Sequence, residues 1–243
     1  MRFQSFASRN IKEIARDPLT VFFGLGFPLA ILLLLSAIQA NIPVEMFEIN
    51  RLAPGIAVFG LSFVSLFSGT LISKDREESF LVRLFASPMK PSDFITAYTL
   101  PLIPIAVLQT VICFAAAALL GMKISLSTLV CLAVLLPADI LFAAIGLLAG
   151  SILNNKQVGG ICGALLTNLS AWLSGTWFSL DLVGGWFKRI AYALPFARAV
   201  EAGRAALTGS GSVTAHLIPV LLWAAGLTAA AILIFMRQLR SDH

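Results

Sequence analysis

Six largely apolar stretches of about twenty residues each divide this chain, and they restrict its fold more than any other feature. A helix needs about 20 residues to cross the roughly 30 Å apolar core of a lipid bilayer. Helices are also the only open segments that satisfy their own backbone hydrogen bonds in lipid. The sequence therefore predicts six transmembrane helices, at about residues 19–40, 52–73, 98–120, 128–150, 158–178 and 213–236.

The composition agrees with a chain embedded in lipid. Of the 243 residues, 58% are hydrophobic and 12% are charged, whereas about a quarter of the residues of a soluble domain are charged. Such a chain has too much apolar surface to bury in water. We therefore expect an all-α polytopic membrane protein, with residues 1–243 forming one transmembrane domain.

The distribution of Lys and Arg predicts the orientation. If both termini are cytoplasmic, 11 of the 17 basic residues lie on the cytoplasmic side, where membrane proteins concentrate them. Four of the other six, Lys188, Arg189, Arg198 and Arg204, lie between the fifth and sixth predicted helices. They could face outer headgroups or an anionic substrate, and a plain structural cap is the alternative. The segment 74–93 is then cytoplasmic.

The first 18 residues predict an amphipathic helix on the membrane surface, which Asp17-Pro18 ends. Helical spacing separates its apolar residues from its arginines. The apolar side holds Phe3, Phe6, Ala7, Ile11, Ile14 and Ala15, and the other side holds Arg2, Arg9 and Arg16. A signal peptide is disfavoured, because its apolar core has about 7 to 15 residues and the run here has 22. A frayed basic tail is the alternative.

The segment 74–93, KDREESFLVRLFASPMKPSD, holds eight of the 29 charged residues of the chain. Its four acids and four bases balance, whereas a lipid anchor is usually polybasic. Helical spacing puts the apolar side chains of residues 80, 81, 84 and 85 on one face, and Ser87-Pro88 ends the helix. The pattern predicts a short amphipathic helix that binds a protein partner. A solvated linker between two spans is the alternative.

This segment resembles the cytoplasmic coupling helix of ABC exporter permeases of the second type, which have six spans and separate ATPase subunits. The matching residues are Asp75, Arg76, Glu77, Arg83, Leu84, Ser87 and Pro88, with Glu78-Ser79-Phe80 in place of the usual Gly-Thr pair. Residues 173–209 are similar to the partly buried outer segment of the same family. The matching residues there are Ser174, Gly175, Phe178, Trp186, Pro195, Arg204 and Gly209.

The resemblance covers nearly the whole chain and implies a permease subunit of an ATP-driven exporter in the plasma membrane of a bacterium. It implies an N-terminal elbow helix, short re-entrant outer helices between the fifth and sixth spans, and a homodimer or heterodimer with a second permease. Separate ABC ATPase subunits would bind ATP-Mg. The expected ATPase contacts are Asp75, Arg76, Glu77, Glu78, Phe80, Arg83, Leu84 and Phe85. Drugs, lipids and lipid-linked or other polysaccharides are all compatible cargoes.

The chain itself is not expected to be an enzyme. It has no G-x-x-x-x-G-K-[ST] loop for nucleotide phosphates, and its longest predicted cytoplasmic loop has about two dozen residues. Cys113, Cys131 and Cys162 each lie inside a predicted span, so we expect neither a disulfide framework nor a metal cluster. No cofactor in the chain and no nucleic-acid partner is expected.

Polar residues inside the predicted spans are candidates for a transport path. Asp139 lies near the middle of the fourth span, where an ionisable group is costly unless it is paired or hydrated. Gln109 and Asn168 can hydrogen-bond between helices. A purely structural Asp139 is the alternative. Gly146 and Gly150 are small residues four positions apart, as are Gly159 and Gly163. Such pairs allow close contact between helices.

Two other classes of function remain open. An ion- or proton-coupled secondary transporter would use Asp139 as carrier and would show gradient-dependent flux without an ATPase. A non-transporting assembly or immunity protein would bind a partner and show no flux.

The predicted topology can be tested with single introduced cysteines. Cysteines at Asn41 and Ser212 should react in intact cells with a thiol reagent that does not cross the membrane, because both positions lie on the predicted outer side. A cysteine at Ser92 should react only after the cells are opened. Labelling of position 92 in intact cells would contradict the orientation.

Overall fold

The structure is a computed structural model that describes residues 2–18, 22–78 and 91–241, and the regular elements in these ranges are all helical. The bounds are α1 Arg2–Arg16, η1 Phe22–Gly26, α3 Phe27–Asn41, η2 Glu45–Phe47, α4 Ile49–Glu77, α6 Pro91–Leu119, α7 Leu126–Ile152, α8 Asn155–Val158, η3 Gly159–Leu166, α9 Thr167–Leu173, α10 Leu180–Val183, α11 Gly185–Ala193, α12 Pro195–Thr208 and α13 Val213–Ser241. The all-α prediction is confirmed for these residues.

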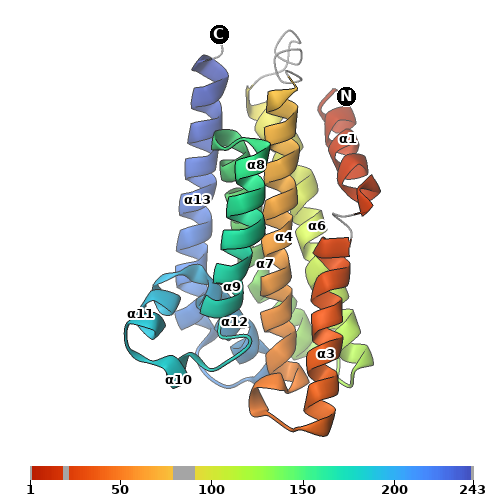
Figure 1. Cartoon of the computed structure of the whole chain (residues 1–243), viewed down its shortest axis with the longest axis vertical. Coiled ribbons are helices and arrows are strands. Elements are labelled where there is room, and N and C mark those ends of the chain that lie inside the picture. The colour runs from red at the N-terminus through yellow and green to blue at the C-terminus, as the bar shows by residue number, and fades with distance from the viewer. Residues whose placement is uncertain (1, 19–21, 79–90, 242–243) are drawn as a thin grey trace.

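The long helices lie side by side in one bundle (Figure 1). Helix α1, the last turn of α4, the first turn of α6 and the last turn of α13 gather at one end, which we call the terminal end. The turns from α3 to α4 and from α6 to α7 lie at the opposite end, together with α10 and α11. Both termini therefore lie on the same side of the bundle, as the predicted topology requires.

Among the described residues, five helices are long and apolar enough to cross a membrane: Phe22–Asn41, Ile49–Glu77, Thr96–Leu119, Leu126–Ile152 and Val213–Arg237. They correspond to five of the six predicted spans. The other prediction, 158–178, falls on the consecutive helices α8, η3 and α9, which end at Leu173. This rod begins with the polar residues Asn155, Lys156 and Gln157, and it is not among the five. Six spans are therefore not confirmed.

Helix α4 is the centre of the bundle, and small residues let it pack closely against α7. The Ser65 hydroxyl donates a hydrogen bond of 2.5 Å to the Phe142 carbonyl. A Cβ added to Gly146 would lie 2.7 Å from the Ser65 carbonyl oxygen, and one on Gly150 would lie 2.7 Å from the Gly69 carbonyl oxygen. The backbones therefore touch where these glycines lie, as the Gly146–Gly150 spacing predicted.

The second predicted glycine pair behaves differently. A Cβ on Gly159 would have no neighbour within 4 Å in the described part of the chain, and one on Gly163 would meet only the Leu66 side chain, at 3.3 Å. The expected close contact at Gly159 is therefore absent here. The same spacing gives a different result because Gly159 faces no neighbouring helix.

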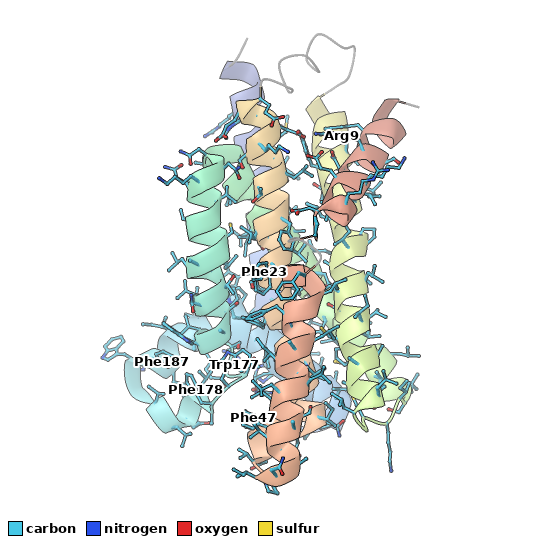
Figure 2. All side chains as sticks on the ribbon, turned by 45° about the vertical axis from the view of Figure 1, so that its right-hand side comes forward. Arg9, Phe23, Phe47, Trp177, Phe178 and Phe187 are labelled. Carbon is cyan, nitrogen blue, oxygen red and sulfur yellow. The ribbon has the colours of Figure 1, made fainter. Side chains whose placement is uncertain are left out.

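Contacts between aromatic rings join η1 and α3 to α4. The Phe27 ring centroid lies 5.7 Å from that of Phe63, and Phe23 stacks on Phe63 at 6.1 Å. Phe59 meets both Phe63, at 5.7 Å, and Trp177 beyond α9, at 5.4 Å. Figure 2 shows Phe23 in η1, just before α3, and Trp177 nearer the opposite end of the bundle. The rings thus connect three segments that are distant in sequence.

Three helices connect α9 to α13, as expected between the last two spans. Helix α12 begins with Pro195 at its first position and ends at Gly209, whose φ of 67° is left-handed. Its residues Phe196 and Val200 are buried in the main core, and Phe196 packs on Phe142 of α7. Helices α10 and α11 lie at the opposite end from the termini (Figure 1). Trp186 of α11 is 77% exposed.

The N-terminal segment forms the predicted helix, but its buried face differs from the prediction. Phe6, Asn10 and Ile14, each four residues apart, are buried, whereas Ile11 is 45% exposed. Arg9, which the sequence pattern puts on the side opposite the apolar residues, is 34% exposed and forms an ion pair with the buried side chain of Asp75. Helical spacing does not predict this pair, because the partner lies 66 residues away.

The α4–α7 contact predicts the effect of a single methyl group. Gly146→Ala should destabilise the fold by about 1–3 kcal/mol, because the Ser65 backbone cannot move aside as a side chain could. Gly160→Ala is the matched control, since its Cβ would meet nothing within 4 Å among the described atoms. Thermal unfolding in detergent should show a lower midpoint for the first variant only. Equal midpoints would contradict the described packing.

Candidate functional site

Three consecutive residues at the terminal end of α4 hold the surrounding helices, and the first is Asp75. Its side chain is 0% exposed. Arg9 of α1 binds it through two parallel contacts, Nη1 to Oδ2 at 2.6 Å and Nη2 to Oδ1 at 2.7 Å. The Tyr98 hydroxyl of α6 donates to Oδ2 at 2.7 Å. Both carboxylate oxygens are thus occupied by donors from two other helices.

Neighbouring contacts fix α1 in the same place. The buried Asn10 amide donates to the Ala97 carbonyl of α6 at 3.1 Å. The Phe6 ring meets the Tyr98 ring edge to face at 5.1 Å, and Tyr98 in turn meets Phe235 of α13 at 6.1 Å. Figure 2 shows Arg9 at the terminal end, between α1 and its neighbours. Residues of α1, α4, α6 and α13 therefore form one cluster.

Electrostatics favour the charged state of Arg9. The hydrogen bonds from its guanidinium to the Asp75 carboxylate raise the pKa of Arg9, and the nearby Glu13 carboxylate acts in the same direction. Arg9 Nη2 also lies 2.7 Å from Glu13, and Glu13 lies 3.5 Å from Lys74 Nζ. A guanidinium is planar and can bind a carboxylate through two bonds at once. The pair therefore fixes the orientation of α1 as well as its position.

The next two residues of α4 bind the turn between α7 and α8. The Arg76 guanidinium donates to the carbonyls of Ser151 and Leu153, the latter at 2.7 Å. These carbonyls lie where α7 ends, a position at which a helix leaves its acceptors unsatisfied. The Glu77 carboxylate accepts from the backbone N–H of Asn155 at 2.8 Å, at the start of α8. Arg76 and Glu77 thus join α4 to two helix ends.

The structure places the predicted ATPase contacts in two groups. Asp75, Arg76 and Glu77 hold helices of this chain together, and Glu78 is exposed where α4 ends. The other four residues, Phe80, Arg83, Leu84 and Phe85, lie outside the described residues. Contact of either group with an ATPase stays a prediction.

The sequence prediction missed Arg9, Asn10 and Tyr98. Tyr98 lay at the edge of an apolar run and gave no sign of a partner. The polar Asn10 on a face with Phe6 and Ile14 was a usable sign, because a polar residue on a buried face needs a partner.

Asp139 and Gln109 lie in the core among α4, α6 and α7. Asp139 is 1% exposed, and its Oδ1 accepts from the Thr110 hydroxyl at 3.0 Å. The Gln109 amide is close to Cys113 Sγ, at 3.3 Å, and to the Ala57 carbonyl, at 3.5 Å. Asp139 Oδ2 and Gln109 Oε1 are buried and have no hydrogen-bond partner among the described residues.

Asn168, the third candidate for a transport path, lies elsewhere. It is on an exposed face of α9, and its amide donates to the Ala164 carbonyl of the preceding turn at 2.8 Å. The structure therefore brings Asp139 and Gln109 to one buried region and leaves Asn168 on the surface of the chain. The three residues therefore do not line one path within a single copy of the described chain. Their roles in transport stay predictions.

Arg204 differs from the other basic residues of the segment between α9 and α13. It is 7% exposed and donates to the carbonyls of Arg51 and Gly175, each at 3.0 Å, and to Glu201 at 2.9 Å. Burial lowers its pKa. Arg204 thus fastens α12 to the start of α4 and to the turn after α9. Its guanidinium is directed into the protein, toward partners of this chain.

Comparison with known proteins identifies the family of this chain. Residues 1–208 match the family described as ABC-2 type transporter. The chain belongs to the ABC-2 type transporter family. The matched residues include α1 and α12. They also include the Asp75 cluster apart from Phe235, that is Asp75 with its neighbours Phe6, Arg9, Asn10 and Tyr98. The chain is therefore an integral membrane protein of a transport permease family.

Two curated relatives share part of the chain. "Putative transport permease ycf38" of Porphyra purpurea is 34% identical over 91 residues, which is 35% of this chain and 31% of that protein. The protein of the same name from Pyropia yezoensis is 32% identical over 91 residues, with the same shares. The chain thus aligns with about a third of the length of these relatives.

The surroundings of Asp139 predict the outcome of one substitution. If Asp139 only joins α6 to α7, Asp139→Asn should keep transport, because the amide oxygen can still accept from Thr110. If its charge or proton takes part in transport, flux should fall at least about tenfold, equivalent to ~1.4 kcal/mol, while the protein still assembles. Thr110→Val is the control that removes only the hydrogen-bond donor. Full transport by Asp139→Asn would remove Asp139 from the functional residues.

Proposed function

We propose that this chain is the permease subunit of an ATP-driven ABC exporter and receives its energy from separate ATPase subunits. The observation that carries the proposal is the family match over residues 1–208, in a sequence without a phosphate-binding G-x-x-x-x-G-K-[ST] loop. If ATP drives transport, its binding site lies outside these 243 residues. The chain would then supply the path and the ATPase would supply the work.

Residues 74–93 are the proposed place where that work enters. The segment begins in the last turn of α4 and ends in the first turn of α6, and both turns lie at the same end of the bundle as both termini. Phe80, Leu84 and Phe85 would supply the buried contact, because apolar anchors dominate most interfaces. Arg83 and Glu77 would set its orientation, since charges at the rim of an interface mainly do so.

The proposed complex has two permeases around one path. Helices α3 and α13 expose apolar side chains, among them Leu34 at 61% and Leu222 at 69%. Such faces suit lipid or a second permease, identical or related. We propose that the α8–η3–α9 rod also crosses the bilayer, which would complete six spans with both termini in the cytoplasm of a bacterium. Drugs, lipids and lipid-linked polysaccharides remain compatible cargoes.

A secondary transporter is the second candidate, and the unpartnered Oδ2 atom of Asp139 favours it. A buried carboxylate oxygen without a donor is costly unless it carries a proton or binds an ion. This function predicts flux that follows an ion or proton gradient in vesicles that hold the chain alone. The ATP-driven exporter predicts no such flux without its ATPase.

The coupling proposal predicts the result of placing a charge on the apolar face of the segment. Leu84→Asp should insert and fold normally but bind its ATPase roughly a hundredfold more weakly, because a buried unpaired charge costs a few kcal/mol. Copurification and stimulated ATP hydrolysis should both be lost. Leu84→Met, which keeps the apolar contact, is the control. A Leu84→Asp chain that keeps both properties would rule out this segment as the coupling element.

A further inference from the structure

We infer that Asp75 is a positioning residue that makes the N-terminal helix α1 a moving part of the coupling apparatus. It does so through its ion pair with Arg9 and its hydrogen bond from Tyr98. The inference rests on the proposed function, because it assumes that force enters after α4. It goes further by assigning roles to three residues that an ATPase would not need to touch.

The geometry of Asp75 excludes a direct docking role in this arrangement. Its side chain is 0% exposed, and each carboxylate oxygen already accepts from a donor of this chain. No surface of the carboxylate is left for a basic residue of another protein. Asp75 can therefore influence coupling only through the helices that it holds.

The position of Asp75 in α4 connects it to the proposed point of entry. It lies in the last turn of α4, which ends at Glu77, just before the segment 79–90 in the sequence. A helical turn is stiff, because each residue is fixed by backbone hydrogen bonds. Displacement of the chain after Glu77 would therefore move the Asp75 carboxylate, and with it the guanidinium of Arg9.

Helix α1 is suited to follow such a movement. In its described side chains only Phe6, Asn10 and Ile14 are buried, so its apolar attachment to the bundle is narrow. The bidentate Arg9–Asp75 ion pair and the Asn10–Ala97 hydrogen bond supply the directional contacts. These bonds determine the rotation and height of α1, which apolar contacts specify less tightly.

Stability alone does not account for an ion pair in which the Asp75 side chain is fully buried and the Arg9 side chain is 34% exposed. The cost of removing a charge from water commonly cancels the attraction of the pair, and an apolar pair of similar volume can be as stable. A charged pair with fixed geometry instead specifies one arrangement of two helices. The neighbouring residues Arg76 and Glu77 bind backbone groups at the end of α7 and at the start of α8. The last turn of α4 can thus pass one displacement to several helices.

The test uses the complex of the permease with its ATPase in lipid nanodiscs. One spin label replaces the exposed Lys12 of α1, and another replaces the exposed Lys123 in the turn between α6 and α7, at the opposite end of the bundle. The three buried cysteines of this chain are changed to alanine. Electron–electron distance measurements compare the complex with and without a non-hydrolysable ATP analogue. In the wild type, ATP binding should change the distance between the labels.

Asp75→Asn keeps the shape of the side chain and removes its charge. It should abolish the ATP-dependent distance change and lower the amount transported per ATP hydrolysed by about tenfold, while the ATPase still copurifies. Tyr98→Phe keeps the ring contacts with Phe6 and Phe235 and loses only the hydroxyl. The Tyr98→Phe variant should fold even if the Asp75→Asn variant does not. It should lower the amount transported per ATP hydrolysed about threefold.

Glu13→Gln is the matched control. Glu13 pairs with Arg9 but makes no contact with Asp75, and its side chain is 31% exposed. This variant should keep both the distance change and the transport ratio. A general weakening of the charges on α1 would instead affect it as much as Asp75→Asn.

The outcomes separate the inference from the proposed function. If Asp75→Asn and Tyr98→Phe both keep the wild-type distance change and transport ratio, the inference is wrong and the proposed function stands. If ATP leaves the wild-type distance unchanged while transport proceeds, the inference is also wrong. If no ATPase copurifies with the wild-type chain and ATP stimulates no transport, both fail.

Discussion

The carboxylate of Asp75 is the contact on which the terminal end of this bundle depends. It is fully buried and holds α1 through Arg9 and α6 through Tyr98, with α13 reached through the Tyr98 ring. Because a buried carboxylate is costly unless its oxygens are paired, these bonds favour an arrangement in which α1, α4 and α6 meet at Asp75. The two residues that follow, Arg76 and Glu77, bind the backbone at the end of α7 and the start of α8.

A second constraint makes this end of α4 mechanically useful. Along its middle, α4 touches α7 almost backbone to backbone, at Gly69, Gly146 and Gly150. Close-packed interiors tolerate little deformation, so under the proposed function a movement applied to the last turn of α4 would be transmitted along the helix. In a member of the ABC-2 type transporter family, this rigidity would suit a helix between the proposed coupling segment and the proposed transport path.

The sequence predicted what depends on local composition and missed what depends on distant partners. Five spans could be found because length and lack of charge are properties of each segment alone. The span predicted at residues 158–178 is not confirmed, because the α8–η3–α9 rod at this place ends at Leu173, although the apolar run continues. Arg9 could not be assigned, because a flexible arginine at the border of a helix face turns toward whichever acid the fold provides. Likewise, only the facing helix distinguishes Gly146–Gly150 from Gly159–Gly163.

Hydrogen–deuterium exchange of the wild-type chain alone in lipid nanodiscs tests the central claim most directly. If Arg9, Asn10 and Tyr98 hold α1 on the bundle, the amides of Arg2–Arg16 should be protected and should open together with the first turns of α6. Exchange of α1 at the rate of an unstructured segment, with α4 and α6 still protected, would contradict the account. It would show that the Asp75 cluster does not hold α1 in place.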